Sequence, residues 1–365
     1  MHDSRDGQKG LYDPMTTLDH GLAALSPAAS SFLARHGHAQ ACLEPLAGDA
    51  SPRRYFRLPE AGLLLMEDHQ DPIAFTAYLR LSYHLSTLGL SAPIIHGAAP
   101  AHGLALVEDF GHRTYTACLG AGEDEHALYA LAVDALLYLH HHNGATQVSQ
   151  PVYEMATLLD ELDVFCDWLA PAVNPAINHS LFARQFRTLW AKALTPVAGK
   201  AETLVLRDFH VDNLMLLPQR QGVARCGLLD FQDAVLGPCE YDLVSLLQDA
   251  RRDLAPGLEQ QMLERYISGA PERLGDAMAI RRRYALLGAQ RHTRIAGTFL
   301  RLSRREGKSR YLGYLPRVLV QLENSLACAG LTDITDLLNT RLPGWQAKGA
   351  ALGDGYHDTQ GAPHD

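Results

Sequence analysis

The chain has 365 residues, of which 47% are apolar, and its 32 basic against 41 acidic residues give a formal net charge of −9. This length allows a sizeable core in two lobes, and the composition is that of an ordinary globular protein. The acidic balance argues against a nucleic-acid partner, and no apolar run approaches the length of a membrane span. Six cysteines without a C-x-x-C pair indicate reduced thiols, so we expect a cytoplasmic, monomeric protein.

Taken in chain order, the pattern divides the sequence into two tails and two lobes. Residues 1–17 and 343–365 carry no apolar periodicity and are expected to be disordered. Residues 18–111 are expected to form a small, β-rich N-lobe that binds a nucleotide. Residues 112–342 are expected to form a mainly helical C-lobe with the catalytic loop and the substrate site.

The predicted N-lobe carries two features that suit a nucleotide. A turn of small residues at 48–51 leads into an arginine-rich strand, and the backbone N–H groups of such a turn can cover phosphates, although a plain hairpin turn explains the same pattern. A later strand, 104–108, leads into a turn where the lobes would join and backbone groups would meet the base. The expected nucleotide contacts are Ser51, Arg53, Arg54, Arg57, Glu108 and Phe110.

Two stretches of the C-lobe are unusual in charge. The predicted helix at 154–169 combines carboxylates with an aromatic face, so Glu161, Asp167 and Trp168 are expected to contact a sugar, although a surface helix with one buried tryptophan fits equally well. Residues 273–317 hold eleven Arg and one Lys against two acids. The preferred interpretation is that this region simply faces the acidic helix at 154–167, and the alternatives are that it receives an anionic substrate group or binds nucleic acid.

The strongest local signal lies in two adjoining segments, residues 204–216 and 227–234. Two short apolar runs bracket a polar loop with Asp208 and Asn213, and a third apolar run ends at Asp230, a pattern that predicts strand, loop, strand, turn, strand. Asp208 would accept the proton of an attacking hydroxyl, and Asn213 and Asp230 are hard ligands for Mg²⁺. The Asp-x4-Asn spacing and the later Asp-Phe match the catalytic loop and metal ligand of kinases, so an ATP-dependent kinase is predicted.

Residues next to this loop are also expected to belong to the site. Arg207 is placed in the catalytic set, and His210 and Gln232 are expected to contact the substrate. Asp242 either braces the loop through backbone N–H groups or caps the following helix. The competing interpretation of the loop is a set of ordinary turns.

The usual strand lysine of kinases is missing. No lysine occurs between Lys9 and Lys192, so an arginine near 53–57 would have to replace it, or the nucleotide is held differently.

The chain resembles the aminoglycoside phosphotransferase/choline-kinase-like superfamily, most closely its anomeric sugar kinases, the N-acetylmuramate/N-acetylglucosamine 1-kinases of bacterial cell-wall recycling. The matching stretches are residues 48–57, 158–169, 207–215, 230–238, 241–247, 290–292 and 307–312. The patterns Asp-Phe-Gln-Asp-Ala from Asp230 and Glu-Leu-x-x-Phe-x-Asp-Trp from Glu161 are the more specific ones. Leu206 departs from the pattern, because relatives carry there the His of His-Arg-Asp, which buttresses the loop.

The resemblance implies an α+β, protein-kinase-like bilobal fold that uses ATP and Mg²⁺. It implies transfer of the γ-phosphate to the C1 hydroxyl of an amino sugar, giving the α-1-phosphate in peptidoglycan recycling. By matching position, Asp208 is the base or hydroxyl-orienting residue, and Asn213 and Asp230 bind the metal. Two alternatives stay open: another small-molecule kinase of the superfamily, for an aminoglycoside or amino-alcohol held by the acids of 154–167, and a catalytically inactive nucleotide-binding regulator.

Overall fold

The computed structural model of the chain describes residues 25–46 and 53–354, which form two compact units. The smaller unit comprises the chain up to Gln70 together with His96–Val107, and the larger comprises Asp71–Ile95 and the chain from Glu108. The helix that follows Asp71 therefore clusters with the larger unit, although the predicted lobe boundaries place it in the N-lobe. Within the described ranges, no helix is both long and apolar enough to cross a membrane.

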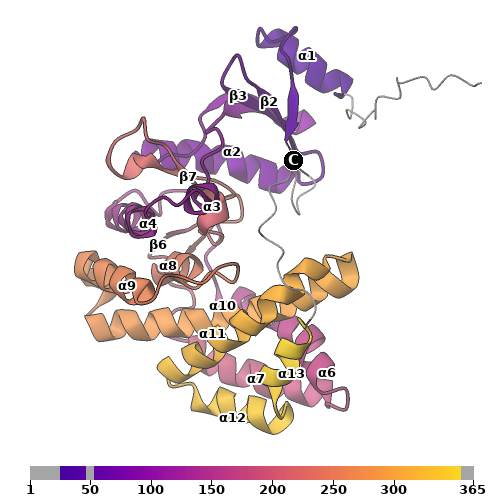
Figure 1. The fold of residues 1–365 in the computed structure, drawn as a ribbon, viewed down its shortest axis with the longest axis vertical. Helices are drawn as coiled ribbons and strands as arrows, with labels where there is room; N and C mark the ends of the chain where they lie inside the picture. Colours follow the sequence, from indigo (N-terminus) through magenta and orange to yellow (C-terminus); the bar gives the residue numbers. More distant parts are fainter. Residues whose placement is uncertain (1–24, 47–52, 355–365) are drawn as a thin grey trace, which may run out of the picture. The chain divides into compact units, whose positions relative to one another are not determined.

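The smaller unit is built on a five-stranded sheet with the strand order β1-β2-β3-β5-β4 (Figure 1). The strands are β1 Glu44–Leu46, β2 Arg54–Leu58, β3 Leu63–Glu67, β4 Ile95–Ala99 and β5 Leu104–Glu108, with a 3-10 turn η1 at Pro100–His102 and a helix α1 at Pro27–Arg35. Strands β2 and β3 are antiparallel, and their register pairs Phe56 with Leu65.

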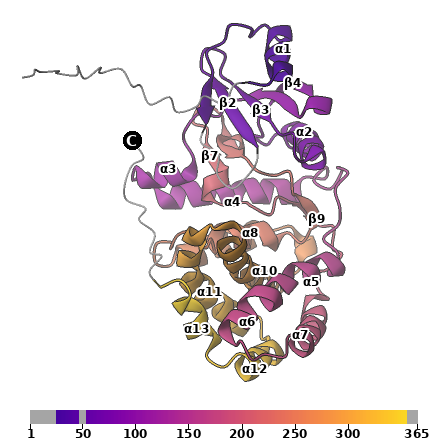
Figure 2. The same cartoon turned by 90° about the vertical axis from the view of Figure 1, so that its right-hand side faces the viewer.

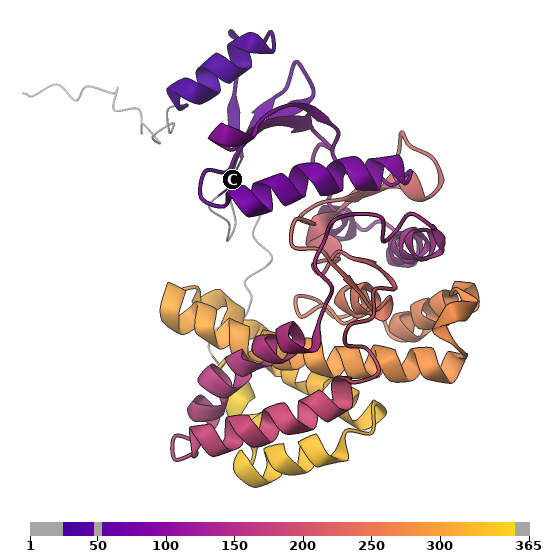
Figure 3. The same cartoon turned by 180° about the vertical axis from the view of Figure 1, so that it is seen from behind.

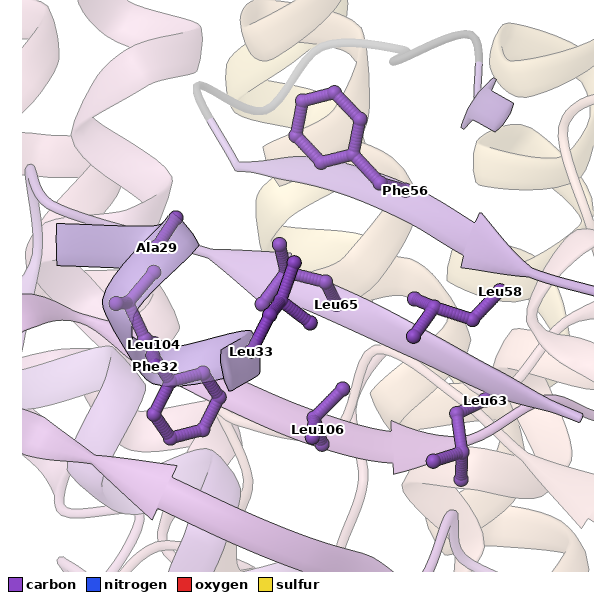
Figure 4. Packing of buried hydrophobic residues seen from close by; sticks show 9 residues of the cluster. All are labelled: Ala29, Phe32, Leu33, Phe56, Leu58, Leu63, Leu65, Leu104 and Leu106. Carbon is purple, nitrogen blue, oxygen red and sulfur yellow. The ribbon is translucent and has the colours of Figure 1, made fainter. Parts of the chain in front are cut away.

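Apolar side chains of α1 and the sheet form the core of this unit (Figure 4). Every second residue of β2 and of β3 points to one face, as strand geometry requires, while α1 presents residues spaced three and four apart. The buried cluster consists of Ala29, Phe32, Leu33, Phe56, Leu58, Leu63, Leu65, Leu104 and Leu106. The predicted strand at 104–108 is confirmed as β5.

The larger unit is mainly helical (Figure 2). Its helices are α2 Pro72–Thr87, α3 Tyr115–Gly120, α4 Glu125–His141, α5 Met155–Val164, α6 Ala170–Val173, α7 His179–Leu194, α8 Glu240–Leu247, α9 Leu258–Gly269, α10 Ala277–Glu306, α11 Leu315–Cys328, α12 Thr332–Arg341 and α13 Trp345–Ala351. A π-helical segment, Phe165–Leu169, joins α5 to α6, and short 3-10 turns occur at Val211–Asn213, Gly222–Arg225, Glu272–Leu274 and Ser309–Tyr314. The long helix α10 packs against α5, the π-helical segment, α8 and α11, which Figure 3 shows from behind.

Helix α13 lies inside the segment 343–365 that the sequence pattern predicts to be disordered. Trp345 opens this helix and is only 1% exposed, and its Nε1 donates to Asn339 Oδ1 at 3.2 Å. A single buried indole can anchor a short terminal helix that has no apolar repeat of its own, and for this reason periodicity did not reveal it.

Four short strands of the larger unit position the polar loop. Strand β6, Thr203–Val205, pairs with β9, Val235–Gly237, and β7, Leu214–Leu216, pairs with β8, Cys226–Leu228. In the β7–β8 hairpin Leu214 lies opposite Leu228, and Leu229 N donates to Asn213 O at 3.0 Å. The residue before β7 and the residues after β8 therefore lie side by side, which confirms the predicted strand–loop–strand–turn–strand arrangement.

Candidate active site

Two residues of the site have a left-handed backbone. Arg207 has a φ of 71° and Asp230 a φ of 56°, and they are the only residues other than glycine with positive φ in the described ranges. Side chains with a Cβ rarely adopt this region, and each such residue costs on the order of 1–3 kcal/mol unless its surroundings enforce it. The structure therefore has to hold both residues in place.

The backbone of Arg207 is held on both of its polar groups. Asp242, in α8, accepts from Leu206 N at 2.7 Å and from Arg207 N at 2.8 Å. Ser245 Oγ donates to Arg207 O at 3.1 Å, and Arg291 Nη1 of α10 donates to the same oxygen at 3.2 Å. Asp242 thus braces the loop, as one of the two sequence interpretations proposes, and it lies inside α8 rather than at its N-cap, which is Cys239.

The side chain of Arg207 is fixed by Glu161, in α5. Arg207 Nη2 forms a short ion pair with Glu161 Oε1, and Tyr153 Oη donates to Glu161 Oε2. The Arg207 guanidinium also lies 5.6 Å from the centre of the Tyr153 ring. Glu161 is therefore brought to the catalytic loop, where it organises Arg207, and its predicted contact with a sugar stays a prediction.

Two buried tyrosines support the arginines around the loop. The Tyr153 and Tyr241 rings pack edge to face, with centres 5.5 Å apart. Arg207 lies over the first ring, and Arg291 lies over the second at 5.7 Å. A guanidinium over an aromatic face gains about 0.5–2 kcal/mol, more when it is desolvated, so each ring fixes one guanidinium beside the loop.

Asp208 is half-buried and carries its charge in this environment. Burial works to raise the pKa of its carboxyl, but the guanidinium groups of Arg291 and Arg294 outweigh that effect and hold the pKa below its ordinary value. Asp208 is thus ionised at neutral pH and able to accept a proton or a hydrogen bond. Burial raises the pKa of Asp242 to about 7, although the hydrogen bonds from two backbone N–H groups favour the charged form and lower the pKa.

Asn213 and Asp230 form an oxygen-rich pair next to Asp208. Asn213 Nδ2 donates to Asp208 O at 3.0 Å and lies 3.5 Å from Asp230 Oδ2. Gln232 Nε2 donates to Asp230 Oδ1 at 2.9 Å. Since the Asn213 nitrogen is anchored on the loop, its amide oxygen is the atom left for a ligand, and with the Asp230 carboxylate it fits the hard oxygen donors that Mg²⁺ prefers.

The side chain of His210 is buried inside the protein. Its side chain is only 4% exposed, its Nε2 lies 3.3 Å from Asn213 Nδ2, and its backbone N donates to Asp208 O. This burial favours support of the loop over the predicted contact with substrate.

Asp167 and Trp168 lie farther along the same chain segment, in the π-helical part. Asp167 is exposed and pairs with His179 of α7 at 2.9 Å, and Trp168 is half-buried. Of the three predicted sugar residues, the structure therefore joins only Glu161 to the loop.

The predicted nucleotide residues fall in both units. In the smaller unit, Arg54 forms an ion pair with Glu67 across β2 and β3, and Arg53 Nε donates to Asp68 Oδ2 at 3.0 Å, while Arg57 is buried. Ser51 lies outside the described residues. In the larger unit, Arg220 bonds to Glu108 and lies 5.1 Å above the Phe110 ring.

Sequence reasoning found Asp242 of α8 but missed Ser245 of the same helix and the arginines of α10. Arg291, Arg294 and Ser245 reach the loop from helices that follow it in the chain. Sequence signals were present, because residues 290–292 match the family pattern and the region is rich in arginine.

Several bases of the region 273–317 pair with acids, and most of these acids lie outside the 154–167 helix. Arg281 pairs with Glu264, Arg283 with Glu202 and Glu240, and Arg317 with Asp253. Only Arg294 reaches an acid of the 154–167 helix, at 3.7 Å from Glu161. Helix α10 does pack against α5, as the preferred interpretation expects, but most of the ion pairs of the region form elsewhere, because α10 is long enough to meet several elements along its 30 residues.

Comparisons with known proteins agree with this geometry. Residues 43–277 match the model of the phosphotransferase enzyme family. A protein of Caulobacter vibrioides named N-acetylmuramate/N-acetylglucosamine kinase is 33% identical over 353 residues, covering 87% of this chain and 96% of the relative. A protein of the same name from Neisseria meningitidis serogroup B is 32% identical over 288 residues, covering 75% and 82%.

Solved structures show the same fold at low identity. The ADP-bound aminoglycoside phosphotransferase APH(2'')-Ib has a TM-score of 0.58 at 16% identity, covering 89% of this chain and 99% of that one. A choline/ethanolamine kinase family protein from Mesorhizobium loti has a TM-score of 0.54 at 14% identity, covering 89% and 97%. These matches confirm the predicted α+β, protein-kinase-like fold with a β-rich smaller part and a mainly helical larger part.

Proposed function

Because the chain belongs to the phosphotransferase enzyme family, we propose that it transfers the γ-phosphate of ATP to the anomeric C1 hydroxyl of N-acetylmuramate or N-acetylglucosamine. The observation that carries the proposal is the constellation of an ionised Asp208 next to the Asn213–Asp230 pair on a strained, braced loop. The relatives named above support the choice of acceptor.

In this reaction the sugar hydroxyl oxygen forms a bond to the γ-phosphorus, and the bond from that phosphorus to the oxygen of ADP breaks. The hydroxyl proton passes to the Asp208 carboxylate, which is held ready by its low pKa. An anomeric hydroxyl is more acidic than an ordinary alcohol, so positioning and charge neutralisation dominate over base strength. The product is the sugar α-1-phosphate, which a later nucleotidyl transfer would consume in peptidoglycan recycling.

The metal is proposed to be held by Asn213 and Asp230. Two protein ligands are typical of Mg²⁺, which fills its remaining positions with water and phosphate oxygens. When bound, Mg²⁺ supplies charge neutralisation across the nucleotide phosphates. In the smaller unit the Arg54–Glu67 pair stands in for the lysine–glutamate pair of other kinases, and it supports Arg54 as a nucleotide contact.

An aminoglycoside or amino-alcohol acceptor is disfavoured because acids of the 154–167 segment already form ion pairs within the protein. A cationic substrate needs unpaired carboxylates, yet the four acids Asp160, Glu161, Asp163 and Asp167 each already have a basic partner. Asp160 and Asp163 pair with Arg187, Asp167 with His179, and Glu161 with Arg207 and Arg294. An inactive regulator is disfavoured as well, because it would have no use for two strained residues.

Phosphorus NMR of the purified protein with Mg-ATP tests the proposal, with N-acetylmuramate, N-acetylglucosamine and an aminoglycoside as parallel acceptors. We expect a sugar phosphate that is coupled to the anomeric proton. Asp208→Asn should lower kcat by a factor on the order of 10²–10⁴ and leave ATP binding intact. Asp212→Asn is the matched control, because this exposed aspartate of the same loop bonds to Thr116 and Arg251 instead.

Two results would overturn the proposal. Phosphate on the aminoglycoside alone would replace the acceptor while keeping the catalytic loop. Thermal stabilisation by Mg-ATP without transfer to any acceptor would favour the regulator. Cytoplasmic location and a monomeric state stay predictions, which gel filtration and cell fractionation can check.

A further inference from the structure

Arg294, in the middle of α10, is a guanidinium beside the catalytic loop that has no hydrogen-bond acceptor among the described residues. Its side chain is 21% exposed, and its Nη1 lies 3.7 Å from Glu161 Oε1, beyond hydrogen-bond distance. Its Nε is buried without an acceptor. A guanidinium carries five N–H donors, and buried polar groups are normally satisfied, so this one is organised for a partner from outside the chain.

The neighbouring arginines of the same helix behave differently. Arg283 bonds to both Glu202 and Glu240, and Arg291 donates to the backbone of Arg207. The acid nearest to Arg294, Glu161, is already engaged by Arg207 and Tyr153. Arg301, seven residues later, also has a buried Nε without an acceptor, so what distinguishes Arg294 is its place beside Glu161 and Asp208.

Arg294 lies on the α5 side of the catalytic loop. Its charge acts on Asp208, Glu161, Tyr153 and Tyr241, and burial, which alone would lower its pKa, is outweighed by these groups. Glu161, the acid nearest to Arg294, contacts Arg207, the residue before Asp208. The guanidinium therefore lies beside the loop residue that would receive the hydroxyl of an acceptor.

We propose that Arg294 binds a carboxylate carried by the acceptor sugar, so that the enzyme selects an acidic amino sugar such as N-acetylmuramate over neutral N-acetylglucosamine. This inference rests on the proposed function and adds the substrate class to it. A carboxylate matches the two parallel N–H donors of a guanidinium in shape as well as in charge. Glu161, fixed by Arg207, keeps Arg294 in place without using up its donors.

The test compares the two sugars on wild type, Arg294→Gln and Arg294→Lys. Hydrogen bonds to charged groups contribute about 1.5–3 kcal/mol, so Arg294→Gln should lower kcat/KM for N-acetylmuramate by about 10- to 100-fold. For N-acetylglucosamine, and for the neutral carboxamide of N-acetylmuramate, only the smaller loss should appear that follows from the weakened stabilisation of the Asp208 charge. The ratio of kcat/KM for N-acetylmuramate to kcat/KM for either neutral sugar should therefore fall by about tenfold or more. Arg294→Lys keeps the positive charge but not the two parallel N–H donors of the guanidinium, so it should recover part of the lost kcat/KM for N-acetylmuramate.

Arg301→Gln is the matched control, because it removes the same charge seven residues later, on the same face of α10. It should leave the ratio of the two kcat/KM values unchanged. Since Arg294 has no hydrogen bond to lose, Arg294→Gln should also unfold at the wild-type temperature or slightly above it.

The outcomes separate this inference from the proposed function. The assignment of Arg294 would be overturned if Arg294→Gln lowered kcat/KM equally for both sugars, or if only Arg301→Gln changed the ratio of the two kcat/KM values. In either case the proposed sugar kinase activity would be unaffected. If wild type phosphorylates neither sugar, the proposed function fails first. If Arg294→Gln lowers kcat/KM for N-acetylmuramate much more than kcat/KM for its carboxamide, the carboxylate contact is established.

Discussion

Gly297 lies where α10 comes closest to the π-helical segment, and its substitution by alanine tests that packing. A Cβ added at Gly297 would lie 2.5 Å from Phe165 N and 2.5 Å from both C and O of Val164. All three atoms belong to one peptide of the backbone at the end of α5. No side-chain rotation can relieve such a contact, so α10 and the π-helical segment would have to separate.

The size of the effect follows from two opposing contributions. Overpacking a close interface costs about 1–3 kcal/mol, and a contact with backbone falls at the upper end. Alanine in a helix interior gains about 1 kcal/mol over glycine. We therefore expect Gly297→Ala to lower the free energy of unfolding by about 2 kcal/mol, which corresponds to about 4–8 °C in Tm for a unit of this size. Because Arg294 and Arg291 lie within two turns of Gly297, kcat should fall as well.

Thermal unfolding followed by circular dichroism, with urea denaturation beside it, measures this effect. Gly120→Ala is the control, because Gly120 ends the helix α3 and nothing lies within 4 Å of its added Cβ. This control should match or exceed wild-type stability. If Gly297→Ala and Gly120→Ala shift Tm in the same direction, the close approach of α10 to the π-helical segment is refuted.

Two further predictions concern the support of the loop and a buried histidine. Asp242→Asn keeps one acceptor but leaves one of the N–H groups of Leu206 and Arg207 unsatisfied. It should therefore lower the unfolding free energy by about 1–3 kcal/mol and kcat by at least tenfold. Wild-type turnover of this variant would contradict the bracing role. Burial lowers the pKa of His140, whose Nδ1 lies 2.9 Å from Tyr266 Oη, to about 3. Its neutral form stabilises the fold above pH 6.5, and this stability is lost as pH falls from 6.5 toward 3. The unfolding free energy of wild type relative to His140→Phe should thus drop by about 1.4 kcal/mol between pH 7.5 and 5.5 in urea titrations, and a constant difference would refute burial of a neutral ring.

The geometry of the candidate catalytic loop was predictable from local sequence, for a physical reason. Alternating apolar runs specify the β7–β8 hairpin, and a hairpin register fixes which flanking residues meet. With Leu214 opposite Leu228, Asn213 and Asp230 have to lie near each other, whatever the rest of the chain does. Their distance from Asp208 is set by the same short loop. The prediction therefore needed only contacts between residues that are close along the chain.

The groups that hold the loop were not predictable in this way. Arg291 lies 84 residues beyond Arg207, and Arg294 follows on the same helix, whose arginines all look alike in sequence. Which of them meets an acid, a backbone oxygen or nothing depends on how α10 packs against α5 and α8. Hydrophobic periodicity indicates which face of a helix is buried, but it does not indicate what that face contacts. Similarly, the buried Trp345 gives no periodic signal.

The identity of residue 207 argues that its side chain has a function of its own. A glycine would adopt a φ of 71° without steric cost, whereas the arginine is strained and needs Asp242, Ser245 and Arg291 to hold its backbone. A residue that only shaped the turn would be better as glycine. The guanidinium must therefore offset the strain through its ion pair with Glu161, which in turn keeps Arg294 beside Asp208. The strain at Arg207 and the lack of hydrogen bonds at Arg294 are thus two parts of one arrangement, in which the fold gives up stability to place a positive charge where the proposed acceptor would bind.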